Sequence, residues 1–170
     1  GGHEPSLIRS MSDTDLNMIA DATQRLPNVM LTVAPESVTI PQTQTLAQAG
    51  VIVSLGHTNA DYDTCMAYMA AGAHNTTHLF NAMSQLGSRN PGLVGATLDS
   101  GDVSASLIAD AVHVHPASMR AALRAKKGSS KIYLVSDAMA AAASDLSQFI
   151  LNGRTVCRRT GTWRLLDGTL

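Results

Sequence analysis

The 170-residue sequence lacks several features that would assign it to a familiar class of protein. Its two cysteines, Cys65 and Cys157, form no C-x-x-C motif and no disulfide framework, so we expect a reducing, cytoplasmic setting. No apolar run reaches the roughly 18 residues of a membrane span, and the first residues carry no basic stretch followed by an apolar one. We therefore expect neither a transmembrane segment nor a signal peptide.

An excess of charge of one sign is also missing. The 12 Lys and Arg residues nearly balance the 13 Asp and Glu residues, and the formal net charge is -1. Proteins that bind nucleic acid or anionic membranes need a basic excess, so we expect neither partner. The basic residues between positions 120 and 131 are interpreted as a solvated helix end. Apolar residues make up 45% of the chain, which is enough for the core of one domain.

The sequence does contain an alternation of strand-like and helix-like segments. Buried strands are predicted at residues 27–34, 51–55, 74–80, 103–109 and 131–136, and helices at residues 12–25, 43–49, 61–71 and 116–126. This alternation predicts an α/β fold built from parallel βαβ units. Five units are too few for a closed eight-stranded barrel of about 250 residues, so the pattern alone leaves an open doubly wound sheet as the alternative. No G-x-G-x-x-G or Walker motif supports a nucleotide-binding version of that sheet.

The C-terminal end of the chain departs from this alternation. Residues 148–151 and 155–158 flank Asn152-Gly153, a dipeptide typical of tight β-hairpin turns. A second turn signal follows at Thr160-Gly161. The sequence therefore predicts a β-hairpin excursion over residues 147–170.

Polar residues follow the end of each predicted strand. They are Glu36 after the first strand, His57 after the second, His78 and Asn81 after the third, Asp110 and His113 after the fourth, and Asp137 after the fifth. The carboxyl ends of parallel strands form one edge of a sheet, and the sites of α/β proteins are built there. We therefore expect a functional site at this edge.

Each of these residues also has a structural interpretation. A single histidine at a strand end more often packs or hydrogen-bonds than binds a metal, and Asp137 alone could cap the next helix. Two histidines on one edge favour a metal site, because imidazole is the commonest ligand of zinc-type ions. Asp137 is then interpreted as the general base toward the attacking water. His74 and His115 are interpreted as structural, and no G-x-S-x-G motif surrounds Ser54 or Ser136, so a serine hydrolase is disfavoured.

Three strings in the sequence closely resemble the N-acetylglucosamine-6-phosphate deacetylase family. They are G-H-T-N-A at 56–60, T-H-L-F-N-A-M at 77–83 and I-A-D-A-V-H at 108–113, with shorter matches at 2–5, 34–36, 91–93 and 134–138. The family belongs to the metal-dependent amidohydrolases, which fold as (β/α)8 barrels of the TIM type. The resemblance therefore implies that residues 1–170 form an incomplete catalytic barrel domain, without its first strands or the family's small β-domain, and that the hairpin of residues 147–170 lies within it.

The resemblance also implies roles for the residues at matching positions. His57 and His78 would bind a divalent metal ion, with zinc expected and iron or another divalent ion as alternatives. Asp137 would deprotonate the attacking water and then protonate the leaving amine, and His3 would polarise the acetyl carbonyl. The substrate, a phosphorylated amino sugar, would be held by Gly2, Asn81, Ala82, Arg89, His113 and Leu170. Arg89 would reach the phosphate from a neighbouring subunit, which implies a homodimer.

Three features depart from the family's pattern. The family's remaining metal ligand is a glutamate in an upstream segment that residues 1–170 do not contain, and Glu36 belongs to the A-P-E string, which the family does not use as that ligand. Ala111 stands where glycine is expected, and residues 140–143 replace a turn that contains Pro or Gly with four alanines. We therefore expect residues 1–170 alone to fold poorly, to bind zinc weakly and to be inactive.

The leading functional hypothesis is hydrolysis of the acetamide of N-acetylglucosamine 6-phosphate to glucosamine 6-phosphate and acetate. One alternative is an amidohydrolase that acts on another N-acyl sugar or on a cyclic amide. The other alternative is a non-catalytic fragment that binds a sugar phosphate. Asn81, Arg89 and His113 favour a phosphorylated substrate, and metal content together with turnover would separate the three hypotheses.

Overall fold

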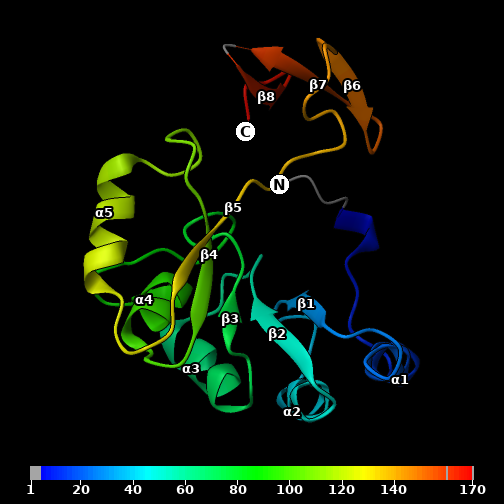
Figure 1. The fold of residues 1–170 in the computed structure, drawn as a ribbon, viewed down its shortest axis with the longest axis vertical. Coiled ribbons are helices and arrows are strands. Elements are labelled where there is room, and N and C mark those ends of the chain that lie inside the picture. Colours follow the sequence, from blue (N-terminus) through cyan, green and yellow to red (C-terminus); the bar gives the residue numbers. More distant parts are fainter. Residues whose placement is uncertain (1–4, 160, 170) are drawn as a thin grey trace. The chain divides into compact units, whose positions relative to one another are not determined.

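The computed structural model describes residues 5–159 and 161–169, which form two compact units (Figure 1). The larger unit, Arg9–Val135, contains a parallel sheet and the α-helices that alternate with its strands. The smaller unit combines residues 5–8 with residues 136–169 and contains an antiparallel sheet. No helix within these described ranges is both long and apolar enough to cross a membrane.

The strands of the larger unit pair in the order in which they occur along the chain. They are β1 (Val29–Val33), β2 (Val51–Leu55), β3 (Asn75–Thr76), β4 (Ser104–Ile108) and β5 (Ile132–Val135). The sheet order is β1-β2-β3-β4-β5, and every neighbouring pair is parallel. The predicted α/β class with a parallel sheet is confirmed. Because the order never reverses, the sheet is not doubly wound and lacks a topological switch point.

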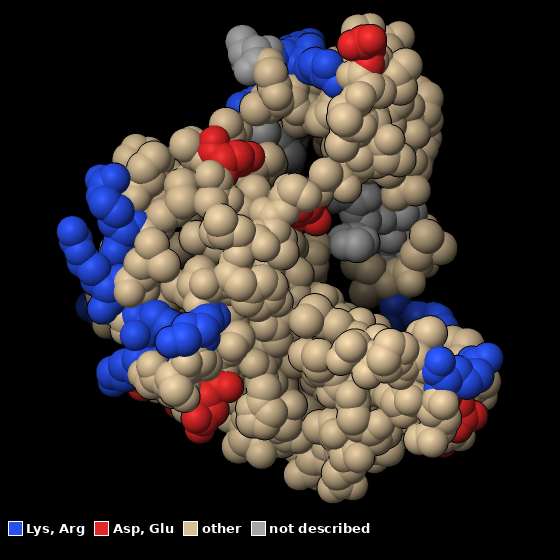
Figure 2. All heavy atoms as spheres, in the orientation of Figure 1, with Lys and Arg blue, Asp and Glu red and all other residues tan. Residues whose placement is uncertain are grey.

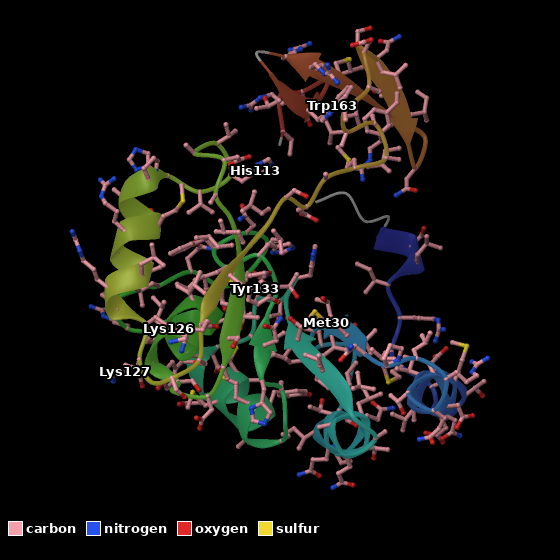
Figure 3. The ribbon with its side chains drawn as sticks, viewed as in Figure 1. Met30, His113, Lys126, Lys127, Tyr133 and Trp163 are labelled. Carbon is pink, nitrogen blue, oxygen red and sulfur yellow. The ribbon has the colours of Figure 1, made fainter. Side chains whose placement is uncertain are left out.

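The helices of the larger unit form a single layer. They are α1 (Asp13–Ala22), α2 (Ile40–Gln48), α3 (Tyr62–Ala70), α4 (Gly92–Asp99) and α5 (Pro116–Ala125), and each contacts the next. The core lies between this layer and the sheet, where Val53 and Leu55 of β2 are buried with Leu46 of α2. On the opposite face of β1 and β2, the register partners Met30 and Ile52 are 52% and 41% exposed (Figure 3). This second face is therefore open at that end of the sheet.

The structure differs from the predicted elements at one additional helix, one helix start and one strand end. Helix α4 was not predicted, because all its residues except Asp99 are buried and a helix that is apolar all round shows no amphipathic period. Helix α2 begins before the predicted residue 43, because Thr39 and Gln42 form a capping box. Strand β3 is much shorter than the predicted 74–80, because His78 and Phe80 have φ values of 36° and 80°, which no strand can adopt.

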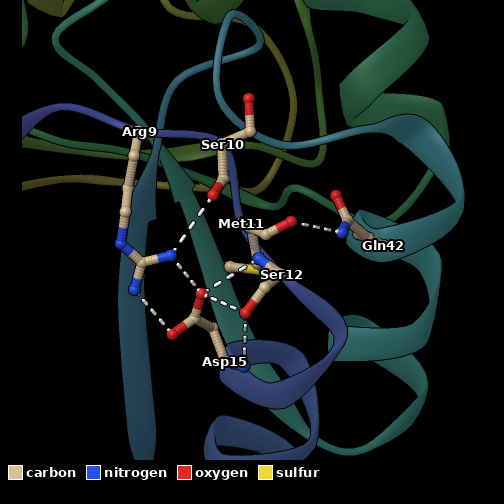
Figure 4. A network of polar contacts seen from close by, with 6 residues as sticks. All are labelled: Arg9, Ser10, Met11, Ser12, Asp15 and Gln42. Carbon is tan, nitrogen blue, oxygen red and sulfur yellow. Dashed lines mark hydrogen bonds and ion pairs between the residues drawn. The ribbon is translucent and has the colours of Figure 1, made fainter.

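A network of polar side chains fixes the start of α1 (Figure 4). Asp15 closes a capping box with Ser12, whose backbone N–H lies 2.9 Å from Asp15 Oδ2. Arg9 Nη2 donates to Asp15 Oδ1 at 2.8 Å, and the guanidinium, together with the hydrogen bonds from Ser12, holds the pKa of that carboxyl well below its usual range. Gln42 Nε2 donates to the carbonyl of Met11 at 3.0 Å. The network therefore ties the entry of α1 to the first turn of α2.

The smaller unit contains a short 3-10 helix, η1 (Pro5–Leu7), and an antiparallel sheet. The sheet strands β6 (Gln148–Leu151), β7 (Arg154–Arg159) and β8 (Thr162–Leu165) pair in the order β6-β7-β8. Asn152 and Gly153 join β6 to β7 with φ values of 50° and 76°, as a type I′ turn requires, so the predicted hairpin is present. The ring of Trp163 on β8 packs edge-on against the ring of Phe149, with 5.0 Å between the two centroids (Figure 3). The guanidinium carbon of Arg158 lies 4.7 Å from the centroid of the Trp163 ring.

Candidate active site

The segments that follow the parallel strands contain non-glycine residues with a left-handed backbone. His57 and His78 follow β2 and β3 with φ values of 51° and 36°, and Asp137 follows β5 with a φ of 51°. The same region of backbone space is occupied by Phe80, Ala82 and Ala111. A left-handed conformation costs an L-residue roughly 1–2 kcal/mol, and residues held there cluster at functional sites. The backbone therefore singles out the same segments as the sequence motifs do.

The side chains of His57 and His78 lie against each other. Their Nε2 atoms are 2.9 Å apart, and the ring centroids are 4.7 Å apart with an interplanar angle of 66°. His78 is buried, whereas His57 is exposed. Two imidazole nitrogens at this distance require either a proton between them or a cation on which both lone pairs converge. The structure thus brings two nitrogen donors of the type preferred by zinc to one point, from two adjacent strands.

The backbone of His78 is fixed by strand β4. The His78 N–H donates to Ser106 Oγ at 2.7 Å, and the next N–H, of Leu79, donates to the Ser106 carbonyl at 2.8 Å. Ser106 is itself buried. Sequence reasoning missed this residue, although a serine inside the apolar run 103–109 was a usable signal.

A row of hydrogen-bonded polar side chains crosses the sheet beside the histidines. Thr77 Oγ1 lies 2.8 Å from Thr32 Oγ1 and 2.6 Å from Ser54 Oγ. Asn75 Nδ2 donates to Ser54 Oγ at 2.8 Å, and Tyr133 OH donates to Asn75 Oδ1 at 3.1 Å (Figure 3). The hydroxyl of Ser54 is therefore hydrogen-bonded to two side chains of the sheet segments.

Glu36 is directed at the loop that carries His57. Its carboxylate accepts hydrogen bonds from Thr58 Oγ1, at 2.8 and 2.7 Å to the two oxygens, and from the Asn59 N–H at 2.9 Å. Within residues 5–159 and 161–169, no three His, Cys, Asp or Glu side chains form a group that could hold a metal ion. Among the described residues, His57 and His78 are therefore not joined by a third side chain that could complete a metal site.

Asn81 has a hydrogen-bonded backbone N–H and a side-chain amide nitrogen without a hydrogen-bond partner among the described residues. Its N–H donates to the carbonyl of His78 at 2.8 Å, which closes the turn after that residue. Its Nδ2 atom is buried and has no hydrogen-bond partner among the described residues. A buried amide donor without a partner is costly, so Nδ2 is open to an acceptor such as a water or a ligand. The neighbouring Ala82 is exposed, with a φ of 48°.

Arg89 lies on an exposed loop before α4. The adjacent Asn90 braces this loop, because its Oδ1 accepts from the N–H groups of Tyr62 at 3.2 Å and Gly92 at 3.0 Å. Arg89 itself makes no hydrogen bond or ion pair with any residue in the part of the chain that the structure describes. Its guanidinium is therefore available to a ligand or to another subunit.

His113 is oriented by a carboxylate of its own loop. Its Nδ1 lies 2.5 Å from Asp110 Oδ2, and Asp110 Oδ1 accepts from the N–H groups of Val112 and His113 at 2.9 Å each. Burial raises the pKa of Asp110, but these hydrogen bonds outweigh burial and hold the pKa below its usual value. With Nδ1 bound to the carboxylate, Nε2 of His113 is left for a ligand.

The remaining predicted site residues are placed less fully. Gly2, His3 and Leu170 lie outside the described residues. Asp137 is exposed and lies two residues beyond the end of β5, within the smaller unit. Its role as a general base stays a prediction.

Two residues with reactive side chains have structural explanations. His115 caps α5, because its Nδ1 accepts from the N–H of Ala117 at 3.1 Å. Cys65 is buried in the core, and burial raises the pKa of its thiol to about 11, so the thiol stays protonated. Neither residue belongs to the candidate site.

The basic residues between positions 120 and 131 lie over α5 and the turn that follows it, while other basic residues lie elsewhere on the visible face (Figure 2). Lys126 Nζ donates to the carbonyl of Ser100 and to Ser130 Oγ at 2.7 Å each, so it fastens the end of α5. Lys127 forms an ion pair with Asp99 of α4. These lysines therefore serve the packing of helices α4 and α5.

The fold and the candidate site together define a class of protein. Their features are parallel strands in chain order, one layer of helices and a histidine pair at two adjacent strand ends. They are features of α/β proteins that build a histidine-based site at the carboxyl edge of a parallel sheet. Comparison with known proteins narrows this class further.

No family model matches the chain. The chain is 42% identical, over all 170 of its residues and 42% of the relative, to an N-acetylgalactosamine-6-phosphate deacetylase of Shewanella sp. (strain ANA-3). It is 36% identical, over 95% of its length and 42% of the relative, to an N-acetylglucosamine-6-phosphate deacetylase of Haemophilus influenzae. It thus spans less than half the length of these relatives.

Solved structures give the same result. The N-acetylglucosamine-6-phosphate deacetylase of Pasteurella multocida matches 99% of this chain with 43% of its own, at a TM-score of 0.89 and 36% identity. A mutant of the Mycobacterium smegmatis enzyme, in complex with N-acetyl-D-glucosamine-6-phosphate, matches 98% of this chain with 43% of its own, at a TM-score of 0.88 and 33% identity. The chain is therefore a homologue of the amino-sugar 6-phosphate deacetylases, which confirms the resemblance seen in its motifs.

Proposed function

We propose that this protein hydrolyses the acetamide of N-acetylglucosamine 6-phosphate. Water adds to the acetyl carbonyl and the C–N bond breaks, which gives acetate and the free amine of glucosamine 6-phosphate. The observation that carries the proposal is the approach of His57 Nε2 to His78 Nε2 at the ends of β2 and β3, in a chain that is homologous to deacetylases over its whole length. A cytoplasmic location stays a prediction.

His57 and His78 would hold a divalent metal ion, for which we propose zinc. The two imidazoles fit such an ion, because they are nitrogen donors and their Nε2 atoms face each other. A catalytic zinc site usually has three protein ligands. We propose that the third ligand, a carboxylate, lies outside residues 1–170. The ion would act as a Lewis acid toward the amide carbonyl and would acidify the attacking water.

Asp137 would carry the proton between the two halves of the reaction. As a carboxylate it would take a proton from the attacking water, and as a carboxylic acid it would return that proton to the leaving nitrogen. His3 would donate a hydrogen bond to the carbonyl oxygen as negative charge develops there. Both assignments come from the matching positions of the family motifs.

The sugar phosphate would be bound by groups with free donors. The buried Nδ2 of Asn81 needs an acceptor, and His113 presents Nε2 from a ring fixed by Asp110. Arg89 would contact the phosphate of a substrate bound to a second subunit, since a guanidinium can bind phosphate in a bidentate manner. The further substrate contacts that we propose are made by Gly2, Ala82 and Leu170.

N-acetylgalactosamine 6-phosphate is a second candidate substrate. The 42% identity to an N-acetylgalactosamine-6-phosphate deacetylase favours it, and a second relative of that name, from Escherichia coli O157:H7, is 33% identical over the whole chain. The two sugars differ only in the configuration at C4. The reaction and the proposed metal ligands are the same for both.

We also propose that the parallel sheet is part of the wall of a (β/α)8 barrel. Its strand order and single helix layer are those of a barrel, and the exposed Met30 and Ile52 lie on the face that further strands would enclose. The deacetylase structures that match the chain are more than twice its length, which supports the presence of such strands.

Acetate release by the full-length natural protein tests the function. The assay compares N-acetylglucosamine 6-phosphate, N-acetylgalactosamine 6-phosphate and unphosphorylated N-acetylglucosamine, each before and after metal removal with a chelator and after zinc is restored. We expect release from the first substrate, little from the unphosphorylated sugar, and loss with chelator that zinc reverses. A higher kcat/KM for the galacto sugar would select the second candidate, and no release from either phosphorylated sugar would overturn the proposal.

A further inference from the structure

We propose that Glu36 is a positioning residue for the candidate metal ligand His57 and that it acts through Thr58. The inference rests on the function proposed above. It assigns a role to one of the two glutamates in the sequence.

The carboxylate of Glu36 comes from a different strand end than the histidine that it supports. Glu36 follows β1 in a turn in which the N–H of Ser37 donates to the Ala34 carbonyl at 2.9 Å. From there its oxygens accept from Thr58 Oγ1, at 2.8 and 2.7 Å, and from the Asn59 N–H at 2.9 Å. The two residues that directly follow His57 are therefore both bound by one anion.

Thr58 connects three of the loops at the strand ends. It is 3% exposed, and its Oγ1 also accepts from the N–H of Ala60 at 2.9 Å. Its carbonyl accepts from the N–H of Ser84 at 2.9 Å, and it forms an isolated bridge with Met83. Met83 and Ser84 belong to the loop that contains His78. Glu36 thus enters a network that fixes the loops after β1, β2 and β3 relative to one another.

The conformation of His57 explains why such an anchor is needed. His57 has a φ of 51°, which a histidine leaves for a more favourable conformation unless its neighbours hold it in place. Hydrogen bonds to a charged acceptor are about twice as strong as bonds between neutral groups. Without the carboxylate, we expect the loop to relax and His57 Nε2 to move away from its position 2.9 Å from His78 Nε2.

Direct metal binding by Glu36 is the competing explanation. The structure disfavours it, because Glu36 forms no group with His57 and His78 that could hold a metal ion among the described residues, and its oxygens are directed at Thr58 and Asn59. The two explanations make different predictions for Thr58. If Glu36 positions His57 through Thr58, removal of the Thr58 hydroxyl weakens metal binding, whereas a direct ligand would bind the metal without that hydroxyl.

Metal affinity of the full-length protein tests the proposal without reference to turnover. The metal-free protein is titrated with zinc in competition with a chromophoric chelator, and with cobalt(II), whose absorption bands report the geometry of its ligands. The variants are Glu36→Ala, Thr58→Val and Thr58→Ser. The control is Asp15→Ala, which removes a carboxylate that accepts four hydrogen bonds but lies at the start of α1 (Figure 4).

We expect Glu36→Ala and Thr58→Val each to weaken zinc binding about 10- to 100-fold, the range seen when a group that orients a metal ligand is removed. Both should also change the cobalt spectrum. Thr58→Ser, which restores the hydroxyl, should recover most of the affinity lost in Thr58→Val. Asp15→Ala should leave zinc affinity and spectrum unchanged, although it lowers the temperature of unfolding.

Three results would overturn the proposal. They are unchanged zinc affinity in Glu36→Ala, loss of zinc in Glu36→Ala with full affinity in Thr58→Val, and equal losses in Glu36→Ala and the Asp15→Ala control. If Glu36→Ala does not fold, Thr58→Val and Thr58→Ser carry the same test. A wild-type protein that binds zinc but releases no acetate would overturn the proposed reaction and leave this inference intact.

Discussion

The loops after β2 and β4 place a histidine by two different means. The two residues after His57 are bound by Glu36, a carboxylate from the loop after another strand, whereas the ring of His113 is bound by Asp110, three residues before it in the same loop. The first arrangement exists only when β1 and β2 are paired, while the second is complete within one turn. The difference suggests that the position of His57, the proposed metal ligand, depends on the paired sheet. The position of His113, the proposed substrate contact, depends on local structure alone.

The largest expected contrast is catalytic. In the full-length protein, His57→Ala should lower kcat about 1,000-fold or more, because Lewis-acid stabilisation is worth several kcal/mol and each 1.36 kcal/mol is a factor of ten. His113→Ala should instead raise KM about tenfold with a small change in kcat, since it removes a hydrogen bond to a charged group. Steady-state acetate release measures both. Similar losses of kcat in the two variants would contradict the division of roles.

The packing of the β2 loop gives the next largest effect. A Cβ atom at Gly56, just before His57, would lie 3.0 Å from both Thr32 Cγ2 and Thr77 Cβ. Such overpacking costs about 1–3 kcal/mol, so Gly56→Ala should lower the free energy of unfolding by that amount in urea. Gly101→Ala is the control, because its added carbon meets only ordinary contacts. Equal stability of the two variants would show that the β2 loop is not tightly packed.

A substitution in the loop after β4 should raise the free energy of unfolding instead of lowering it. Ala111 occupies a left-handed position with a φ of 63°. Ala111→Gly removes a strain of about 1–2 kcal/mol and adds about 0.5–1 kcal/mol of chain entropy to be lost on folding. The variant should therefore be more stable by up to about 1.5 kcal/mol in urea unfolding. Ala121→Gly, inside α5, should be less stable by about 1 kcal/mol, and a loss in both variants would contradict the strain at Ala111.

The smallest expected effect concerns pH. The folded-state pKa of Asp110 lies below the unfolded value near 3.9, so the stability it contributes is present above that pH and is lost as the pH falls through the folded value. Its side chain is 39% exposed, so the contribution should stay below about 1 kcal/mol. Between pH of about 5 and 3, the urea midpoint should fall less for Asp110→Asn than for the wild type. An identical fall of the urea midpoint in both proteins would show that Asp110 does not contribute to the acid sensitivity.

What the sequence predicted correctly was encoded locally. The run 51–55 has the bounds of β2, and Asn152-Gly153 forms the expected turn, because both signals lie within a few residues. The approach of His57 to His78 also followed from sequence, since parallel strands bring their carboxyl ends to one edge. What was missed depends on tertiary structure. The buried α4 shows no period, and the bond between Glu36 and Thr58 joins residues 22 positions apart in separate loops.

The sequential order of the parallel strands has a consequence for how the sheet is made during translation. Each strand from β2 to β5 pairs with the strand synthesised just before it. Among the described strands β1 to β5, none has to be inserted between two that are already paired, and none pairs with a strand from a distant part of the chain. Pairing between nearby segments loses less chain entropy on closure than pairing between remote ones. The sheet can therefore lengthen one βα unit at a time, in the order in which the ribosome releases it.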